Sequence, residues 1–192
     1  MSRVGEGRRF VLLDRDGTLI ESHHYLADPA KVRLLPRVGE GLRRLAAMGL
    51  GLVVVTNQSA VARGRLGLDG LRAIHDRLAD ELARERVRLD GLYFCPHHPD
   101  DGCACRKPRT GMVERAAEEH GFSPGDSFVI GDDACDVDLG RACGATTLLV
   151  STGFGDRVRR ERLATPDHLV DDLVQAAEVI WDNLRRTADP RT

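Results

Sequence analysis

The sequence alternates between short apolar segments rich in β-branched residues and longer segments in which apolar residues recur every three or four positions. Short segments of this kind form strands that are buried on both faces, and the longer ones form helices that cover a sheet. The alternation therefore predicts an α/β fold with a doubly wound, mainly parallel, Rossmann-like sheet of five strands.

The boundaries of these segments can be placed from the apolar pattern. The expected strands are Phe10–Leu13, Gly51–Thr56, Gly91–Cys95, Ser127–Gly131 and Thr146–Val150. The expected helices are Gly39–Met48, Leu68–Val87, Gly111–His120, Ala134–Cys143 and His168–Arg186. Gly49 and Gly121 stand where a helix end favours a left-handed residue. Because no repeat or long linker divides the chain, we expect one domain over residues 1–192, with a flexible tail at 187–192.

Charge and hydropathy exclude several classes of protein. The 28 lysines and arginines nearly balance the 30 aspartates and glutamates, and the net charge is −2. A protein that binds nucleic acid usually has a strongly basic face, so no such partner is expected. No apolar stretch approaches the roughly 20 residues that cross a bilayer, and the first ten residues lack the apolar part of a signal peptide. We therefore expect a cytoplasmic protein without a membrane partner. A monomer is also expected, although charge and hydropathy do not determine the oligomeric state.

Carboxylates follow two of the expected strands. Asp14 and Asp16 come after the first strand, and Asp132 and Asp133 come after the fourth. Since the carboxyl ends of parallel strands meet at one edge of a sheet, these side chains can share a divalent cation, and Mg²⁺ prefers such oxygen ligands. The alternative is that the aspartates cap turns and helices.

Neutral and basic groups arrive at the same edge. The run from Thr56 to Ser59 follows the second strand with hydrogen-bonding side chains, and Lys107 lies just before the expected helix Gly111–His120. Such groups can bind phosphate oxygens. Taken singly, Thr56 and Asn57 suit helix caps and Lys107 suits a solvated surface. Their common arrival at strand and helix ends favours a shared site.

Three of the five cysteines lie close together in the sequence. Residues 95 to 105 contain a Cys₃His set that follows the third strand: Cys95, His97, Cys103 and Cys105. This pattern suits a closed, tetrahedral structural zinc site. A reactive thiol cluster and a disulfide are the alternatives, and His98 is the rival of His97. Cys135 and Cys143 are expected to be buried as small apolar side chains.

Four motifs resemble those of haloacid-dehalogenase-superfamily phosphatases. They are DRDGT (Asp14–Thr18), VVVTNQS (Val53–Ser59), RKP (Arg106–Pro108) and IGDDACD (Ile130–Asp136). Together with CPHHP and the following CACRKP, they most resemble the D-glycero-D-manno-heptose 1,7-bisphosphate phosphatases, with the histidinol-phosphate phosphatases next. The resemblance covers about residues 10–150 and implies the haloacid-dehalogenase variant of the Rossmann-like fold.

The resemblance implies a role for each motif. Asp14 is the nucleophile that forms an aspartyl-phosphate, and Asp16 is the general acid and base. Thr56 and Lys107 stabilise the phosphoryl oxygens. The Mg²⁺ ligands are Asp14, the backbone carbonyl of Asp16, and Asp132. The zinc ligands are the Cys₃His set, in which the metal braces the loop.

Substrate recognition is expected from loops. Only 41 residues separate Asp14 from Thr56 and 50 separate Thr56 from Lys107, which leaves no room for a cap domain. The expected contacts are Arg15, Ser22, His23, His24, Tyr25, Asn57, Gln58, Ser59, Arg106 and Asp133. By the resemblance, Arg106 recognises the part of the substrate remote from the reacting phosphate. Two residues depart from the family pattern: Asp133 replaces a usual Lys, and Ala60 replaces a usual Gly.

The function implied is the Mg²⁺-dependent removal of the C7 phosphate of D-glycero-D-manno-heptose 1,7-bisphosphate, which gives heptose 1-phosphate. Hydrolysis of histidinol phosphate or of another small phosphosugar is the alternative, and the carboxylate of Asp133 would suit the amine of histidinol phosphate. A third hypothesis is a noncatalytic phosphosugar-binding protein, which the full set of nucleophile, acid–base and metal-binding residues disfavours.

Overall fold

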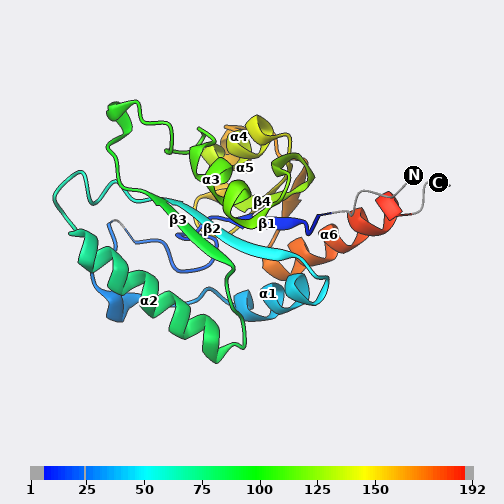
Figure 1. Cartoon of the computed structure of the whole chain (residues 1–192), viewed down its shortest axis with the longest axis horizontal. Coiled ribbons are helices and arrows are strands. Elements are labelled where there is room, and N and C mark those ends of the chain that lie inside the picture. The colour runs from blue at the N-terminus through cyan, green and yellow to red at the C-terminus, as the bar shows by residue number, and fades with distance from the viewer. Residues whose placement is uncertain (1–6, 24, 189–192) are drawn as a thin grey trace.

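A six-stranded, wholly parallel sheet forms the centre of the computed structural model, which describes residues 7–23 and 25–188 (Figure 1). The strand order is β3-β2-β1-β4-β5-β6. The strands are β1 (Phe10–Leu13), β2 (Gly51–Asn57), β3 (Gly91–Cys95), β4 (Phe128–Gly131), β5 (Thr146–Val150) and β6 (His168–Val170). The predicted contact residue His24 lies outside the described residues.

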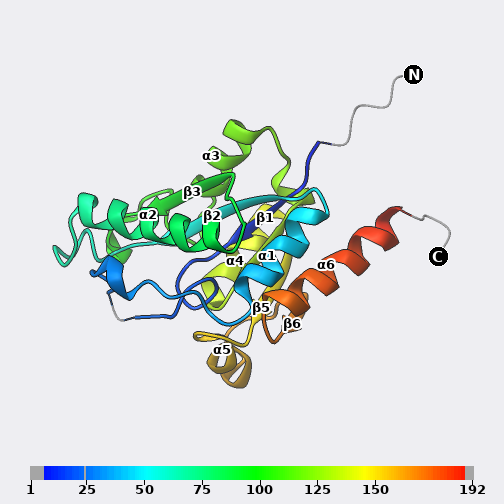
Figure 2. The same cartoon turned by 90° about the horizontal axis from the view of Figure 1, so that it is seen from below.

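Helices cover both faces of the sheet (Figures 1 and 2). One face carries α1 (Val38–Ala47), α2 (Leu68–Arg84) and α6 (Leu173–Ala188). The other carries α3 (Gly111–His120), α4 (Ala134–Cys143) and α5 (Gly155–Glu161). Short 3₁₀ turns lie at Pro29–Lys31, Pro99–Asp101 and Pro124–Asp126. This is the doubly wound arrangement expected from the alternating sequence pattern.

Side-chain alternation along β1 explains the two layers. Val11 and Leu13 pack in the core beneath α1, α2 and α6, whereas Phe10 and Leu12 pack beneath α3 and α4. All four side chains are buried, because a central parallel strand has helices on both faces. β1 and β4 are therefore fixed on both sides, and rigid strand ends are available for a site.

The strand order reverses between β1 and β4, which is where ligands bind in open α/β sheets. The backbone N–H of Asp14 donates to the carbonyl of Ile130 at 2.9 Å, and this bond joins the two strand ends. The residues that follow β1 and β4 consequently meet at one point of the sheet edge.

The C-terminal part differs from the sequence prediction. His168–Val170 forms β6 beside β5 instead of starting the last helix, which begins at Leu173. The side chain of Asp172 accepts hydrogen bonds from the backbone N–H groups of residues 174 and 175, both at 2.9 Å, and so caps the helix after the strand. The five-strand prediction was therefore one strand short, and α5 was not predicted.

Smaller predictions had mixed outcomes. Gly49 and Gly121 have φ values of 80° and 67° after α1 and α3, as predicted. Cys135 and Cys143, which were expected to be buried, are half-buried, and Cys143 packs against the core beneath α3 and α4. Residues 187 and 188 belong to α6 and not to a flexible tail, and residues 189–192 lie outside the described residues. In the described part of the chain, no helix is long and apolar enough to cross a membrane.

Candidate active site and metal centres

Three buried carboxylates meet where β1 and β4 end. Asp14 follows β1, Asp132 follows β4, and Asp136 lies in the first turn of α4. Their oxygen atoms come within 4.8 Å of one another. The strand ends position the first two side chains, and the first turn of α4 directs the third back toward them.

Lys107 is the basic partner of this cluster. Its buried Nζ lies 2.5 Å from Oδ1 of Asp14 and 2.6 Å from Oδ1 of Asp136. Attraction to these two carboxylates outweighs burial and raises the pKa of Lys107, so the ammonium stays charged. One ammonium leaves two of the three carboxylates unbalanced when all are ionised.

This charge arrangement fits a divalent cation. Burial, opposed by Lys107, raises the pKa of Asp14 to about 7, and burial with repulsion from Asp14 and Asp136 raises the pKa of Asp132 to about 8. Carboxylates that resist ionisation because of burial and mutual repulsion are stabilised in their charged form by a bound cation. An all-oxygen donor set is the kind that Mg²⁺ prefers.

Two glycines let the backbone close around Asp132. A Cβ atom on Gly153 would lie 2.0 Å from Oδ2 of Asp132, and one on Gly17 would lie 2.2 Å from it. Both glycines also have positive φ, 57° and 85°. The N–H of Phe154 donates to the same oxygen at 2.8 Å. The loops after β1 and β5 thus fix the orientation of Asp132.

Asp16 has a separate set of partners. The Nε of Arg15 donates to its Oδ2 and Nη2 to its Oδ1, each at 3.0 Å. The amide of Gln58 donates to Oδ2 of Asp16 and to Oγ1 of Thr56, both at 2.8 Å. Arg15 is only 1% exposed, which makes this support rigid. The Asp16 carboxylate therefore stands beside the three-carboxylate cluster without belonging to it.

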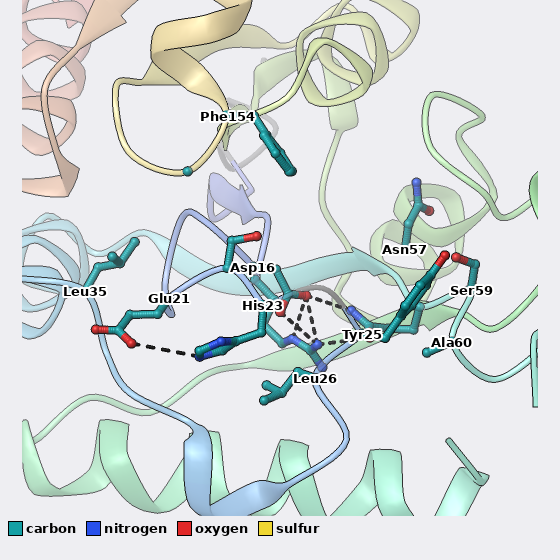
Figure 3. Close-up of a pocket in the computed structure, with 14 residues that line it drawn as sticks. Asp16, Glu21, His23, Tyr25, Leu26, Leu35, Asn57, Ser59, Ala60 and Phe154 are labelled. Atoms are coloured by element: carbon teal, nitrogen blue, oxygen red, sulfur yellow. Dashed lines mark hydrogen bonds and ion pairs between the residues drawn. The ribbon is translucent and has the colours of Figure 1, made fainter. Parts of the chain in front are cut away.

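Two adjoining cavities surround these groups, and Figure 3 shows the larger one. The smaller, of about 210 Å³, contains the carboxylate cluster and Lys107, and the larger, of about 690 Å³, opens beside Arg15 and Tyr25. Both are lined by Asp16, Ser22, Asn57 and Phe154. A group that reacts at Asp14 can therefore continue into a wider space past Asp16.

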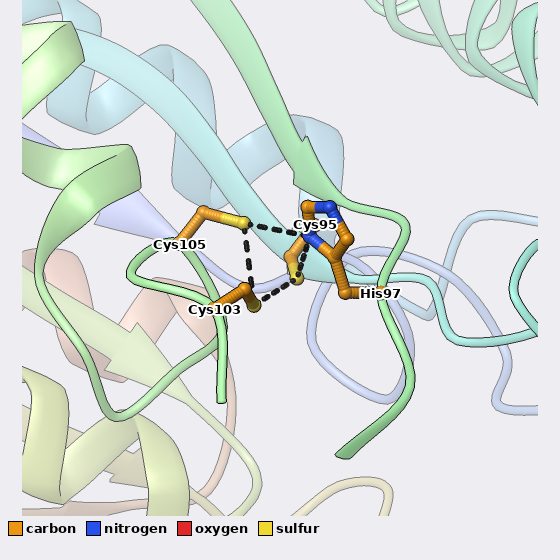
Figure 4. Close-up of side chains that lie close together, drawn as sticks. All are labelled: Cys95, His97, Cys103 and Cys105. Carbon is orange, nitrogen blue, oxygen red and sulfur yellow. Dashed lines mark hydrogen bonds between the residues drawn. The ribbon is translucent and has the colours of Figure 1, made fainter. Parts of the chain in front are cut away.

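The Cys₃His set gathers at the end of β3 (Figure 4). Sγ of Cys103 lies 3.5 Å from Sγ of Cys95 and 3.6 Å from that of Cys105. Nδ1 of His97 lies 3.6 Å and 3.2 Å from the sulfurs of Cys95 and Cys105. Ligands around a tetrahedral zinc ion are about 3.5–3.8 Å apart, so the donor set and its spacing fit zinc. The rival His98 instead accepts from the N–H of Asp100 at 3.3 Å.

Known phosphatases resemble the chain over most of its length. It is 37% identical over 191 residues to the D-glycero-D-manno-heptose-1,7-bisphosphate 7-phosphatase of Thermosynechococcus vestitus, with 92% of this chain and 97% of that protein covered. The chain belongs to the heptose-1,7-bisphosphate 7-phosphatase family. The family assignment made from the four motifs is thereby confirmed.

Two further comparisons agree with this family. The D-glycero-beta-D-manno-heptose-1,7-bisphosphate 7-phosphatase of Pseudomonas aeruginosa is 34% identical, with 90% of this chain and 98% of that protein covered. The crystal structure of D,D-heptose 1,7-bisphosphate phosphatase from B. bronchiseptica, complexed with magnesium and phosphate, superposes with a TM-score of 0.84 at 32% identity and covers 91% of this chain and 99% of that chain. A haloacid-dehalogenase-like hydrolase family also matches residues 104–176.

The predicted site residues of this phosphatase lie together. Apart from the Cys₃His set, those that the structure describes each line at least one of the two cavities. The smaller cavity holds Asp14, Thr56, Arg106, Lys107, Asp132 and Asp133, the larger holds Arg15, His23, Tyr25, Gln58 and Ser59, and both include Asp16, Ser22 and Asn57. Placement around the cavities is what the structure shows, and the role of each residue stays a prediction.

The structure shows the immediate surroundings of three of these residues. Asn57 clamps the RKP segment, because its Oδ1 accepts from the N–H of Lys107 at 3.0 Å and its Nδ2 donates to the Lys107 carbonyl at 3.2 Å. Asp133 accepts from the N–H of Ala134 at 2.6 Å and caps α4, which is the alternative weighed for the aspartates. A buried Nη1 of Arg106 has no partner among the described residues.

Two residues of the site were given no role of their own by the sequence analysis. Asp136 was noted close behind Asp132 in IGDDACD, and its spacing of one helical turn was the signal that could have assigned it to the cluster. Phe154 follows β5 and lines both cavities. The only sequence signal for Phe154 was its position shortly after a strand. The course of the loop after β5 depends on the close approach of Gly153 to Asp132, which the sequence does not show.

Proposed function

We propose that the chain is a Mg²⁺-dependent phosphatase that removes the C7 phosphate of D-glycero-D-manno-heptose 1,7-bisphosphate and leaves heptose 1-phosphate. The observation that carries this proposal is the lysine-bound Asp14 beside Asp132 and Asp136, in a small cavity that opens into a larger one. The names of the relatives support the substrate, and the magnesium and phosphate in the B. bronchiseptica structure support the cation and the reacting group.

Asp14 is the nucleophile in this proposal. Its carboxylate attacks the C7 phosphorus, the bond from phosphorus to the C7 oxygen breaks, and an aspartyl-phosphate forms. Lys107, 2.5 Å from Asp14, holds the nucleophile and offsets negative charge on the transferred group. Asp14, Asp132 and the Asp16 carbonyl would hold Mg²⁺ near Asp136, and the bound ion supplies further neutralisation of the phosphoryl oxygens.

Asp16 is the proposed general acid and general base. Its carboxyl group donates a proton to the C7 oxygen as that oxygen leaves. It then accepts a proton from a water molecule whose oxygen attacks phosphorus, so that the bond between phosphorus and Asp14 breaks and free phosphate forms. The contacts from Arg15 and Gln58 keep the carboxyl group aimed into the space shared by both cavities.

Arg106 is the proposed contact for the second phosphate. Its guanidinium lines the smaller cavity, and its buried Nη1 lacks a partner among residues 7–23 and 25–188. An unsatisfied buried N–H is costly, and an anionic oxygen is the acceptor that best offsets this cost. A bisphosphate would supply it, whereas histidinol phosphate carries a cationic amine in place of the second phosphate.

The test is a comparison of kcat/KM in the presence of Mg²⁺ for the α and β anomers of heptose 1,7-bisphosphate, histidinol phosphate and fructose 1,6-bisphosphate. We expect one heptose anomer to exceed the other substrates by at least about tenfold, because a missing charged contact commonly costs over 1.4 kcal/mol. A preference for histidinol phosphate by an order of magnitude would overturn the substrate. Absence of turnover with every compound would favour a noncatalytic binding protein.

The proposal extends to the state of the protein in the cell. We expect one capless domain over residues 1–192 that acts as a cytoplasmic monomer. The cluster of unpaired thiols supports a reducing compartment, where a Cys₃His set keeps its metal-binding form. Light scattering coupled to gel filtration should give the mass of a single chain, and a dimer mass would contradict the monomer.

A further inference from the structure

Phe154 is an exposed apolar side chain at the active site. Its exposed fraction is 51%, and four other large apolar side chains in the described part of the chain are similarly exposed: Leu68, Leu163, Leu169 and Trp181. Of these five, Phe154 alone lines the two active-site cavities. Large apolar side chains gain free energy when they are covered, so a half-exposed ring inside a binding cavity is ready to pack against a ligand.

The backbone around Phe154 is fixed to the active site. Its N–H donates to Asp132 at 2.8 Å, and Oγ1 of Thr152 donates to the carbonyl of Gly17 at 2.6 Å. Between them, Gly153 approaches Asp132 so closely that no side chain fits. The exposure of the ring therefore does not come from a loosely held loop. The same contacts that orient Asp132 also set the place of the aromatic ring.

The ring stands at the junction of the two cavities. In Figure 3 it projects from its loop toward the space beside Asp16, across from the ring of Tyr25. Tyr25 is itself contacted by two guanidinium groups, with Cζ of Arg65 4.7 Å and that of Arg63 5.9 Å from its ring centroid. Phe154 therefore borders the space between Asp14 and the larger cavity.

We propose that Phe154 is a specificity-determining residue whose ring face packs against the carbon skeleton of a phosphosugar, next to the reacting phosphate. This inference rests on the proposed function. A sugar presents hydroxyl groups at its edge and C–H groups on its faces, and C–H groups pack favourably on the negative face of an aromatic ring. The polar side chains Ser22, Asn57 and Gln58 lie in the same cavity and suit the hydroxyl groups.

This arrangement would give selectivity without a cap domain. A small phosphate ester or anhydride offers the ring little apolar surface, whereas a phosphosugar places its carbon skeleton at the junction of the 210 Å³ and 690 Å³ cavities, where the ring lies. Phe154 should therefore contribute to binding of the sugar and add little to the chemistry at phosphorus. Its removal should raise KM for the sugar more than it lowers kcat.

The experiment compares Phe154→Ala with the wild type on heptose 1,7-bisphosphate and on acetyl phosphate, which has no sugar. We expect KM for the bisphosphate to rise about tenfold, which corresponds to about 1.4 kcal/mol, and the ratio of kcat/KM for bisphosphate to that for acetyl phosphate to fall by a similar factor. Phe154→Tyr keeps the ring and should retain the wild-type ratio within twofold. Leu163→Ala is the matched control, since Leu163 is also 51% exposed and lines neither cavity.

Two results would overturn the inference. One is a kcat/KM that is unchanged for both substrates in Phe154→Ala, and the other is an equal fall in kcat/KM for both substrates, which would indicate an effect through Asp132. If the wild type does not hydrolyse heptose bisphosphate, the proposed function fails, and the ratio is then measured with histidinol phosphate. A tenfold fall of that ratio would still support a role for the ring, and its absence would exclude one.

Discussion

The carboxylate cluster and the Cys₃His loop are both suited to a metal ion, but they are built in opposite ways. Asp14 lies far in the sequence from Asp132 and Asp136, and the three buried side chains meet because β1 and β4 are neighbours. The Cys₃His ligands lie within residues 95–105 at an edge strand, and His97 is exposed. The fold assembles the first site, whereas the ligands of the second organise their own loop.

This difference separates chemistry from stability. A catalytic cation neutralises reacting charge in a scaffold that already exists, and a structural zinc ion supplies part of the folding free energy. We therefore expect changes at the carboxylates to remove activity and leave the fold intact. Changes at the cysteines should lower the stability of the fold and largely preserve the activity of the protein that remains folded.

Asp14→Asn should have the largest effect and tests the first half of the comparison. The amide is a poor nucleophile, so kcat should fall by at least about 10⁴-fold, while the melting temperature stays within about 3 °C of the wild type. Steady-state phosphate release and a thermal melt measure the two quantities. Substantial turnover by the variant would remove Asp14 from the role of nucleophile.

Cys103→Ala should give the opposite pattern. Loss of one zinc ligand should lower the free energy of unfolding by about 4 kcal/mol, or roughly 10 °C in melting temperature, because the loop loses its metal. Activity of the remaining folded protein at low temperature should fall less than tenfold. Cys143→Ala, at a half-buried thiol outside the cluster, is the control. If zinc analysis shows one ion per chain in Cys103→Ala as well as in Cys143→Ala, Cys103 is not a ligand.

Asp132→Asn should weaken magnesium activation. Replacing a charged ligand by a neutral one should raise the Mg²⁺ concentration for half-maximal activity by about 100-fold, while the zinc content stays constant. A magnesium titration of activity measures the shift. The comparison would break down if the variant lost zinc and thermal stability together, since that would show the two sites to be coupled.

His75 offers the smallest test, on the carboxylate side. Burial, helped by the charge of Arg15, lowers the pKa of His75 on α2 from 6.5 to about 4. Because the neutral form is favoured in the folded state, its contribution to stability is fully present above pH 6.5 and is lost as the pH falls toward 4. Between pH 7 and pH 5 the loss is about 2 kcal/mol.

The His75→Leu variant should lack this loss. Urea unfolding of both proteins at pH 7 and pH 5 gives the difference, in which any acid effect on the Cys₃His loop is common to both and cancels. An equal change in the free energy of unfolding between pH 7 and pH 5 in the two proteins would show that protonation of His75 does not cause the acid sensitivity.

The sequence predicted the parts of the molecule that follow directly from periodicity. The bounds of β1, β3, β5, α3 and α4 agree with the predicted ranges, because apolar runs mark where the strands end and recurring apolar residues mark the extent of the helices. Asp14 and Asp132 could be placed at one edge for the same reason. β6 has only three residues, which are half-buried, exposed and buried in turn, and this pattern merges with the helix that follows.

The rest depended on tertiary geometry. The support of Asp16 by Gln58 joins residues 42 positions apart, and the Asn57 clamp on Lys107 joins residues 50 apart. The motifs that contain these residues do not indicate which of their polar groups will form hydrogen bonds with one another. The place of Phe154 depends in the same way on how the loop after β5 crosses the glycine after β1.

The short span of the Cys₃His loop also affects the order of events during synthesis. All four of its ligands have been made by residue 105, whereas Asp136 comes 31 residues later, about 2–6 s at ordinary rates of translation. The loop can therefore close around its metal while the carboxylate cluster is still incomplete. Lys107 lies two positions beyond it, so the ammonium is already tethered near its final place when the last carboxylate leaves the ribosome.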